Sequence, residues 1–155
     1  MAGGYNAFGL DELVRRSVVF LRGCGEMLRA LHAVDPGSFA DVLTGAGPSV
    51  IHADPGPYNV IVDPVTGAVR AVIDWELARI GDPIEDLALV EWNMRIWWES
   101  AGDVLRHLYD AYGRLPEWSG RHAAMIERCR AYYAASRDEV KREQLRRTEA
   151  FLDLC

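Results

Sequence analysis

Residues 50–62 read VIHADPGPYNVIV, and this stretch decides the expected fold. Pro55 and Pro57 lack N–H donors and restrict φ, so the middle of the stretch cannot be regular helix or strand. The run at 59–62 predicts a strand, DPVTG at 63–67 has the residue types of a turn, and AVRAVID at 68–74 predicts a second strand. The sequence therefore predicts a β-hairpin that begins with a stiff, proline-containing loop.

A helix is predicted upstream of the hairpin, over residues 10–33. Apolar side chains recur there at three- and four-residue spacing and form one stripe. Gly23 and Gly25 interrupt the stripe, and each costs about 1 kcal/mol relative to alanine inside a helix. Their presence predicts that a neighbouring element packs closely against this helix. The pair Pro36-Gly37 ends the segment.

Further helices are predicted downstream. Asp82 has the residue type and position of an N-cap, Pro83 suits the first helical position, and Glu85 can complete a capping box. Residues 102–154 predict two or three more helices, with breaks near 113–116 and around 136–138. We therefore expect one α+β domain over residues 1–155, mostly α, with one small β-hairpin.

Composition limits the classes of partner. The chain has 155 residues and a net charge of −6, and neither nucleic acid nor an anionic membrane attracts a protein of that sign. No apolar run approaches the length of a membrane span. Three scattered cysteines disfavour a disulfide framework and a cysteine-based zinc site, and they suit a reducing cytoplasm, where we expect the protein to reside. Charge is unevenly distributed along the chain: the net charge of residues 1–120 is −8 and that of residues 121–155 is +2.

Three oxygen-bearing side chains are expected to meet at the hairpin. Asp54 and Asn59 stand at the two ends of the proline-containing loop, and Asp74 ends the second strand. Two carboxylates and one amide oxygen are hard donors that suit Mg²⁺. Asp54 can alternatively orient a substrate hydroxyl and accept its proton.

Three motifs carry a resemblance to a known family. HADPGPYN at 52–59 fits the pattern H-x-D-x-x-x-x-N, and IDWE at 73–76 is followed by GDPIEDLA at 81–88. LRALHAVD at 28–35 fits L-x-x-L-H-x-[IV]-D. In this order and spacing, over roughly residues 13–113, the chain resembles the aminoglycoside phosphotransferase and small-molecule kinase family, relatives of the protein-kinase fold.

The resemblance implies a role for each matching residue. Asp54 is implied as the catalytic base for the acceptor hydroxyl, and Asn59 and Asp74 as ligands of Mg²⁺ that also bridges the phosphates of ATP. The expected supporting residues are His52, Asp82 and Asp86, and the candidates to face the substrate are Trp75 and Glu76. Position 53 is commonly glycine in the family, and here it is alanine.

One departure concerns the family's N-terminal lobe, which supplies a phosphate-covering loop and a strand lysine. The chain has one lysine, Lys141, and no glycine-rich strand–loop–strand at its start. We therefore expect the family's C-terminal lobe, with the nucleotide-binding N-terminal lobe absent. The resemblance implies phosphorylation of a hydroxyl on an aminoglycoside-like molecule or another metabolite. The alternative is a truncated, non-catalytic lobe that self-associates or binds a separate N-terminal lobe through its exposed lobe-facing surface.

Three other interpretations remain. A metallohydrolase site is disfavoured, because one histidine beside Asp54 and Asp74 leaves too few ligands for zinc. The arginine-rich stretch 121–147 is predicted to be a solvated helix face. A group of aromatic residues is expected to pack between helices, and any exposed members would form the acceptor wall that the resemblance implies; the group comprises Trp92, Trp97, Trp98, Tyr109 and Tyr112.

Overall fold

The computed structural model describes residues 7–98, 102–133 and 138–153, with the backbone alone for residues 7–11. Helices dominate, as expected for the α+β class. Their order with the strands is α1 (Ala7–His32), the 3-10 helix η1 (Pro36–Phe39), β1 (Ser49–Ile51), β2 (Val60–Val62), β3 (Val69–Val72), β4 (Arg79–Gly81), α2 (Pro83–Trp97), α3 (Gly102–Tyr112), α4 (Trp118–Tyr133) and α5 (Glu139–Glu149). Within the described parts of the chain, no helix is long and apolar enough to cross a membrane.

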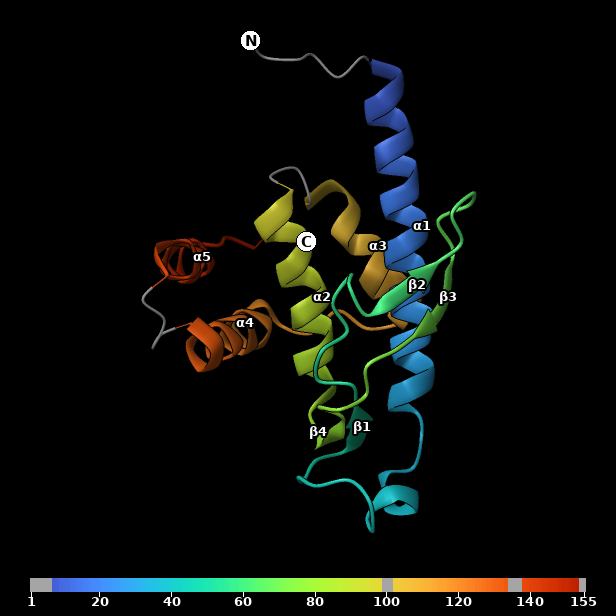
Figure 1. Cartoon of the computed structure of the whole chain (residues 1–155), viewed down its shortest axis with the longest axis vertical. Coiled ribbons are helices and arrows are strands. Elements are labelled where there is room, and N and C mark those ends of the chain that lie inside the picture. The colour runs from blue at the N-terminus through green and yellow to red at the C-terminus, as the bar shows by residue number, and fades with distance from the viewer. Residues whose placement is uncertain (1–6, 99–101, 134–137, 154–155) are drawn as a thin grey trace.

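The long helix α1 forms one side of the molecule, with α3 and the hairpin β2–β3 beside it (Figure 1). Its two glycines mark the contacts that the sequence predicts. A Cβ on Gly23 would lie 2.7 Å from Val69 Cγ2, and a Cβ on Gly25 would lie 2.3 Å from the carbonyl oxygen of Leu108. Because real Cβ atoms do not approach other atoms so closely, β3 and α3 can come this near to the α1 backbone only at positions that carry glycine. The predicted close packing is confirmed.

The predicted hairpin is present, but it is not the only strand pair. β2 and β3 are antiparallel, with Val60 opposite Val72. A second antiparallel pair joins β1 to β4, with Val50 opposite Ile80. The expectation of a single hairpin was therefore wrong. Each strand of the second pair has only three residues, and their partners are far apart in the sequence, so no local turn signal announces the pairing.

Helix α2 lies between two apolar clusters and begins with the predicted capping box. Asp82 accepts a hydrogen bond from the N–H of Ile84 (2.9 Å), and the Glu85 side chain accepts one from the N–H of Asp82 (3.4 Å). One face of α2 packs with α1 and α3, through Leu87 and Val90. The opposite side packs with α4 and α5, through residues that include Leu89, Trp92, Met125 and Cys129.

Three helices follow residue 102, where the sequence predicts two or three. The chain breaks between α3 and α4 near the expected residues 113–116. Asp138 caps α5 by accepting a hydrogen bond from the N–H of Val140 (2.9 Å). Ser136 and Arg137 of the second expected break lie outside the described residues.

A buried ionic network joins α2 to α3 and α4. Glu91 is fully buried, and its carboxylate accepts hydrogen bonds from Arg95 Nε (2.8 Å), from Arg121 Nη1 (2.7 and 2.8 Å) and from the Tyr109 hydroxyl. Burial, and then the neighbouring Glu91 charge, raise the pKa of the Tyr109 hydroxyl well above its ordinary value, so it remains a donor. Arg121 also bonds the carbonyl oxygen of Pro116 (2.9 Å). The network therefore connects α2, which carries Glu91 and Arg95, to α3 through Tyr109 and to α4 through Arg121.

We predict that Glu91→Gln lowers the free energy of unfolding by about 3–5 kcal/mol, because it removes the buried negative charge that faces the guanidinium groups of Arg95 and Arg121. Glu149→Gln is the matched control. It removes the acid of an exposed pair with Arg130 and should cost no more than about 1 kcal/mol. Urea unfolding of both variants measures the difference, and equal losses would contradict the role given to Glu91.

Candidate active site

The loop at residues 52–59 is held at its start by a buried carboxylate. Asp86, in the first turn of α2, accepts hydrogen bonds from the backbone N–H of His52 and of Ala53, both at 2.8 Å. Its Oδ2 also accepts a bond from His32 Nε2 (3.1 Å), and His32 Nδ1 lies 3.1 Å from the Tyr112 hydroxyl. The His32 side chain thus connects Asp86 to Tyr112. Asp86 fixes the backbone immediately before Asp54.

Two residues of this region have a left-handed backbone although neither is glycine. Ala53 has φ 64° and Asp74 has φ 66°. A left-handed conformation costs about 1–2 kcal/mol for a residue with a Cβ. This cost gives the physical reason that glycine suits position 53. The two bonds from Asp86 to residues 52 and 53 supply the compensation at Ala53.

The His52 ring connects the loop to the end of β3. It is fully buried, its Nδ1 accepts a hydrogen bond from the N–H of Asp54 (3.2 Å), and its Nε2 donates one to the carbonyl oxygen of Ile73 (3.0 Å). The Trp75 ring packs against it, with ring centroids 4.6 Å apart. Both nitrogens of His52 are therefore engaged, and the segment before Asp74 is fixed relative to the loop.

Asp54, Asn59 and Asp74 come from two segments that hydrogen bonds join. Asn59 Nδ2 donates to the carboxylate Oδ2 of Asp54 (3.0 Å) and to its carbonyl oxygen (2.9 Å). The N–H of Ile73 donates to the carbonyl oxygen of Asn59 (2.9 Å), one residue before Asp74. The Asp74 side chain is exposed to solvent. The structure thus brings the loop and the end of β3 together, with Asp54 and Asn59 in direct contact.

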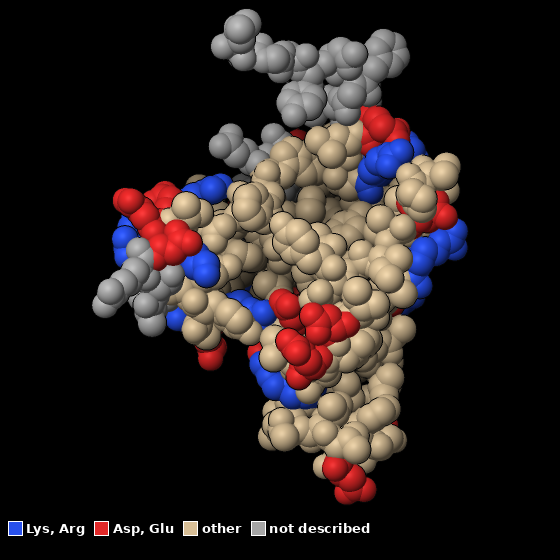
Figure 2. Space-filling model, in the orientation of Figure 1, with Lys and Arg blue, Asp and Glu red and all other residues tan. Residues whose placement is uncertain are grey.

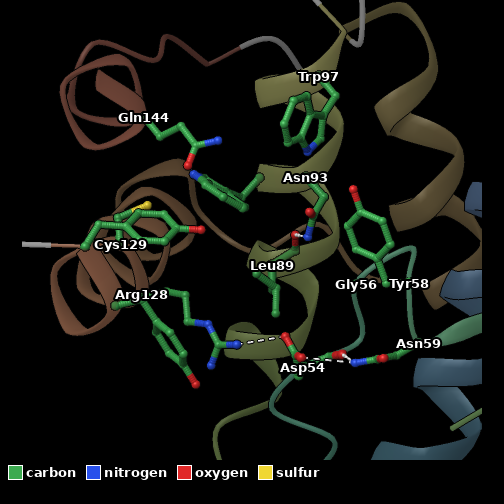
Figure 3. Close-up of a pocket in the computed structure, with 13 residues that line it drawn as sticks. Asp54, Gly56, Tyr58, Asn59, Leu89, Asn93, Trp97, Arg128, Cys129 and Gln144 are labelled. Atoms are coloured by element: carbon green, nitrogen blue, oxygen red, sulfur yellow. Dashed lines mark hydrogen bonds and ion pairs between the residues drawn. The ribbon is translucent and has the colours of Figure 1, made fainter. Parts of the chain in front are cut away.

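A cavity of about 290 Å³ opens beside Asp54, between the loop and helices α2, α4 and α5. Figure 2 shows this face of the molecule hollowed between the α4–α5 side and the α1 side. Arg128 reaches across from α4, and its Nη2 donates to Asp54 Oδ1 at 2.8 Å (Figure 3). The other lining residues are Gly56, Tyr58, Asn59, Leu89, Trp92, Asn93, Trp97, Cys129, Tyr132, Tyr133 and Gln144. Burial raises the pKa of the Cys129 thiol and of the Tyr133 hydroxyl, so both groups are uncharged at neutral pH.

A second cavity, of about 470 Å³, lies on the other side of Arg128 and is lined partly by the same residues. Glu76, a candidate to face the substrate, lines this second cavity and not the first. Trp75 lines neither of the two cavities, and its indole N–H donates to the carbonyl oxygen of Val72 (3.0 Å). Of the aromatic group that was expected to pack between helices, Trp92 and Trp97 line the first cavity, whereas Tyr109 is buried in the ionic network.

A sequence model of the phosphotransferase enzyme family matches residues 39–132, which is more than half of the chain. The chain belongs to the phosphotransferase enzyme family. The matched region contains the loop at 52–59, the hairpin, α2, α3 and most of α4. The cavity beside Asp54 is therefore formed almost entirely by the part of the chain that defines this membership.

One curated phosphotransferase is similar over a shorter region. The viomycin phosphotransferase of Streptomyces vinaceus is 42% identical over 52 residues, which is 32% of this chain and 18% of that protein. The chain thus matches less than a fifth of that phosphotransferase's length. No solved structure matches the chain.

Arg128 is the residue of this phosphotransferase-family site that sequence reasoning missed. The stretch 121–147 was expected to be a solvated face, and for Arg121 and Arg128 this was wrong, because Arg121 is buried and Arg128 bonds Asp54. The signal was present in the spacing. Arg121 and Arg128 are seven residues apart and share one face of α4 with the buried Met125 and Cys129.

We predict that Asp86→Asn loosens the start of the loop. One carboxylate oxygen becomes an NH₂ group that faces a backbone N–H, and a buried donor left without an acceptor costs about 1–3 kcal/mol. Amide hydrogen exchange at residues 52 and 53 should accelerate, and the free energy of unfolding should fall by that amount. Asp82→Asn is the control on the same helix, because asparagine caps helices about as well as aspartate. Unchanged exchange in the Asp86 variant would contradict the bracing role.

Proposed function

We propose that the chain is the catalytic lobe of a phosphotransferase that transfers a phosphoryl group from Mg·ATP to a hydroxyl of a small molecule. The observation that supports it is the Asp54 carboxylate, bonded to Asn59 and facing the cavity of about 290 Å³. Phosphoryl transfer depends mainly on positioning and charge neutralisation. The braced Asp54 carboxylate would supply the positioning of the acceptor, and a bound Mg²⁺ would supply the neutralisation.

Asp54 would bind and orient the acceptor hydroxyl. Its two oxygens are held by Asn59 and Arg128, so the carboxylate has a defined direction at the edge of the cavity. Each carboxylate oxygen has two lone-pair sites, and one remains for a hydroxyl proton. A hydroxyl that donates to this oxygen becomes a better nucleophile as its proton moves to Asp54.

The oxygen donors of Asn59 and Asp74 fit a magnesium ion. The Asn59 amide nitrogen is taken by Asp54, which leaves its oxygen as the group that can bind an ion. The Asp74 carboxylate is exposed. In the described residues, no group of three or more His, Cys, Asp or Glu side chains could hold a metal. Mg²⁺ bound through two protein ligands and the phosphates of ATP would supply charge neutralisation.

A zinc hydrolase site fits this geometry less well. His52 is the histidine nearest to Asp54 along the chain, and both of its ring nitrogens already have backbone partners. A metal ligand must offer a free nitrogen lone pair.

The alternative function is a non-catalytic lobe that binds a partner. Apolar side chains are exposed on the hairpin and just after it, at Ile61, Val62, Ile73 and Trp75, and Tyr58 is exposed in the loop. Clustered exposed apolar groups favour association. The partner would be a second copy of the chain or a separate N-terminal lobe. Binding of Mg·ATP decides between this function and the catalytic one.

We predict that isothermal titration detects Mg·ATP binding to the chain with a dissociation constant below millimolar. Asp74→Asn should weaken this binding about tenfold or more, which corresponds to about 1.4 kcal/mol, because a charged ligand of the ion is lost. Asp63→Asn is the control, since Asp63 caps the turn of the same hairpin and lies outside the site. No heat of binding with the unchanged chain would favour the non-catalytic lobe.

Asp54→Asn should leave Mg·ATP binding nearly unchanged and lower phosphoryl transfer about 100- to 10,000-fold, the range typical of a lost general base. The measurement is ADP release with a panel of hydroxyl compounds as acceptors. Turnover equal to that of the unchanged chain would remove Asp54 from the mechanism.

A further inference from the structure

Arg128 lines both cavities, and its hydrogen bonding to the described residues leaves some of its donors unused. A guanidinium has five N–H donors, and one of those of Arg128 is bonded to Asp54. Its carbon Cζ lies 4.1 Å from the centre of the Tyr132 ring, which fixes the plane of the group. The side chain is 27% exposed and lines both cavities. A molecule whose hydroxyl reaches Asp54 must therefore place neighbouring atoms beside Arg128.

The charge of the first cavity does not suit a polycation. Among its described lining residues, Asp54 is the one acid and Arg128 the one basic residue, and they are paired. Two aromatic rings of the lining already face cations of the protein, Arg128 over Tyr132 and Lys141 Nζ 5.9 Å from the Tyr133 ring. An organic cation would find the acid and these ring faces occupied, and the Arg128 charge would repel it.

We propose that the phosphate acceptor is a hydroxyl compound that carries an anionic oxygen group, such as a carboxylate, close to the reacting hydroxyl, and that Arg128 binds this group. The inference rests on the proposed function in one respect: it assumes that the molecule bound in the cavity is the phosphate acceptor. Arg128 offers charge-assisted hydrogen bonds to such an oxygen, which are stronger than hydrogen bonds between neutral groups. The amides of Asn93 and Gln144 and the aromatic walls accept the uncharged part.

The test uses three sugars of similar size and different charge: glucuronate, glucose and glucosamine. Ligand-observed NMR measures their binding to the chain without nucleotide or metal. We expect affinity to fall from glucuronate to glucose to glucosamine. Arg128→Gln should weaken glucuronate binding about tenfold, so that glucuronate no longer binds more tightly than glucose and glucosamine. Arg130→Gln is the control, because Arg130 lies on the same helix in an exposed pair with Glu149, and this variant should keep the order of the three affinities.

Asp54→Asn provides a second measurement. It removes the negative charge that faces Arg128, so glucuronate affinity should rise while glucosamine affinity falls. If the Arg128–Asp54 pair were only structural, Asp54→Asn would change the free energy of unfolding but would leave the relative affinities for glucuronate and glucosamine unchanged. The proposal is overturned if glucosamine binds best, if the order survives Arg128→Gln, or if none of the three sugars binds at millimolar concentration. Because nucleotide is absent, these outcomes are independent of whether the chain transfers phosphate.

Discussion

The arrangement of the site depends on the carboxylate of Asp86. It is fully buried, and without partners such a charge would be strongly unfavourable. Its partners are the two backbone N–H groups before Asp54 and the imidazole of His32. The same bonds that satisfy the buried charge hold Ala53 in a left-handed conformation and direct the chain toward the cavity. The same hydrogen bonds of Asp86 thus serve both the stability of the fold and the geometry of the loop.

Helix α2 connects the loop at 52–59 to the rest of the molecule. Its first turn carries Asp82, the cap, and Asp86, the brace of the loop, while its middle carries Glu91, the centre of the buried ionic network. Its apolar faces contact α1 and α3 on one side and α4 and α5 on the other. The helix therefore relates the loop that supplies Asp54 to the helix that supplies Arg128.

The cavity beside Asp54 is formed by several segments of the chain. The loop at 52–59 and Asp74 lie in the region that the phosphotransferase family model matches. Arg128 and Tyr132, in the last turns of α4, also lie in that region, whereas Tyr133 and, on α5, Gln144 lie beyond it. The cavity is thus lined by segments that lie far apart along the chain, most of them within the matched region.

Local patterns along the sequence were sufficient for the hairpin, the capping box at Asp82, the glycine contacts of α1 and the grouping of Asp54 with Asn59, because each depends on residues near one another or on sterics at one position. The pairing of β1 with β4, the contact of His32 with Asp86, and the reach of Arg128 to Asp54 join residues 28 to 74 positions apart. Such contacts are selected by how the helices pack, and packing depends on the fit of all side chains at once. The contact between Asp54 and Asn59 was therefore predictable from residue order, whereas the cavity beside the loop and the charges that line it were decided only by the folded chain.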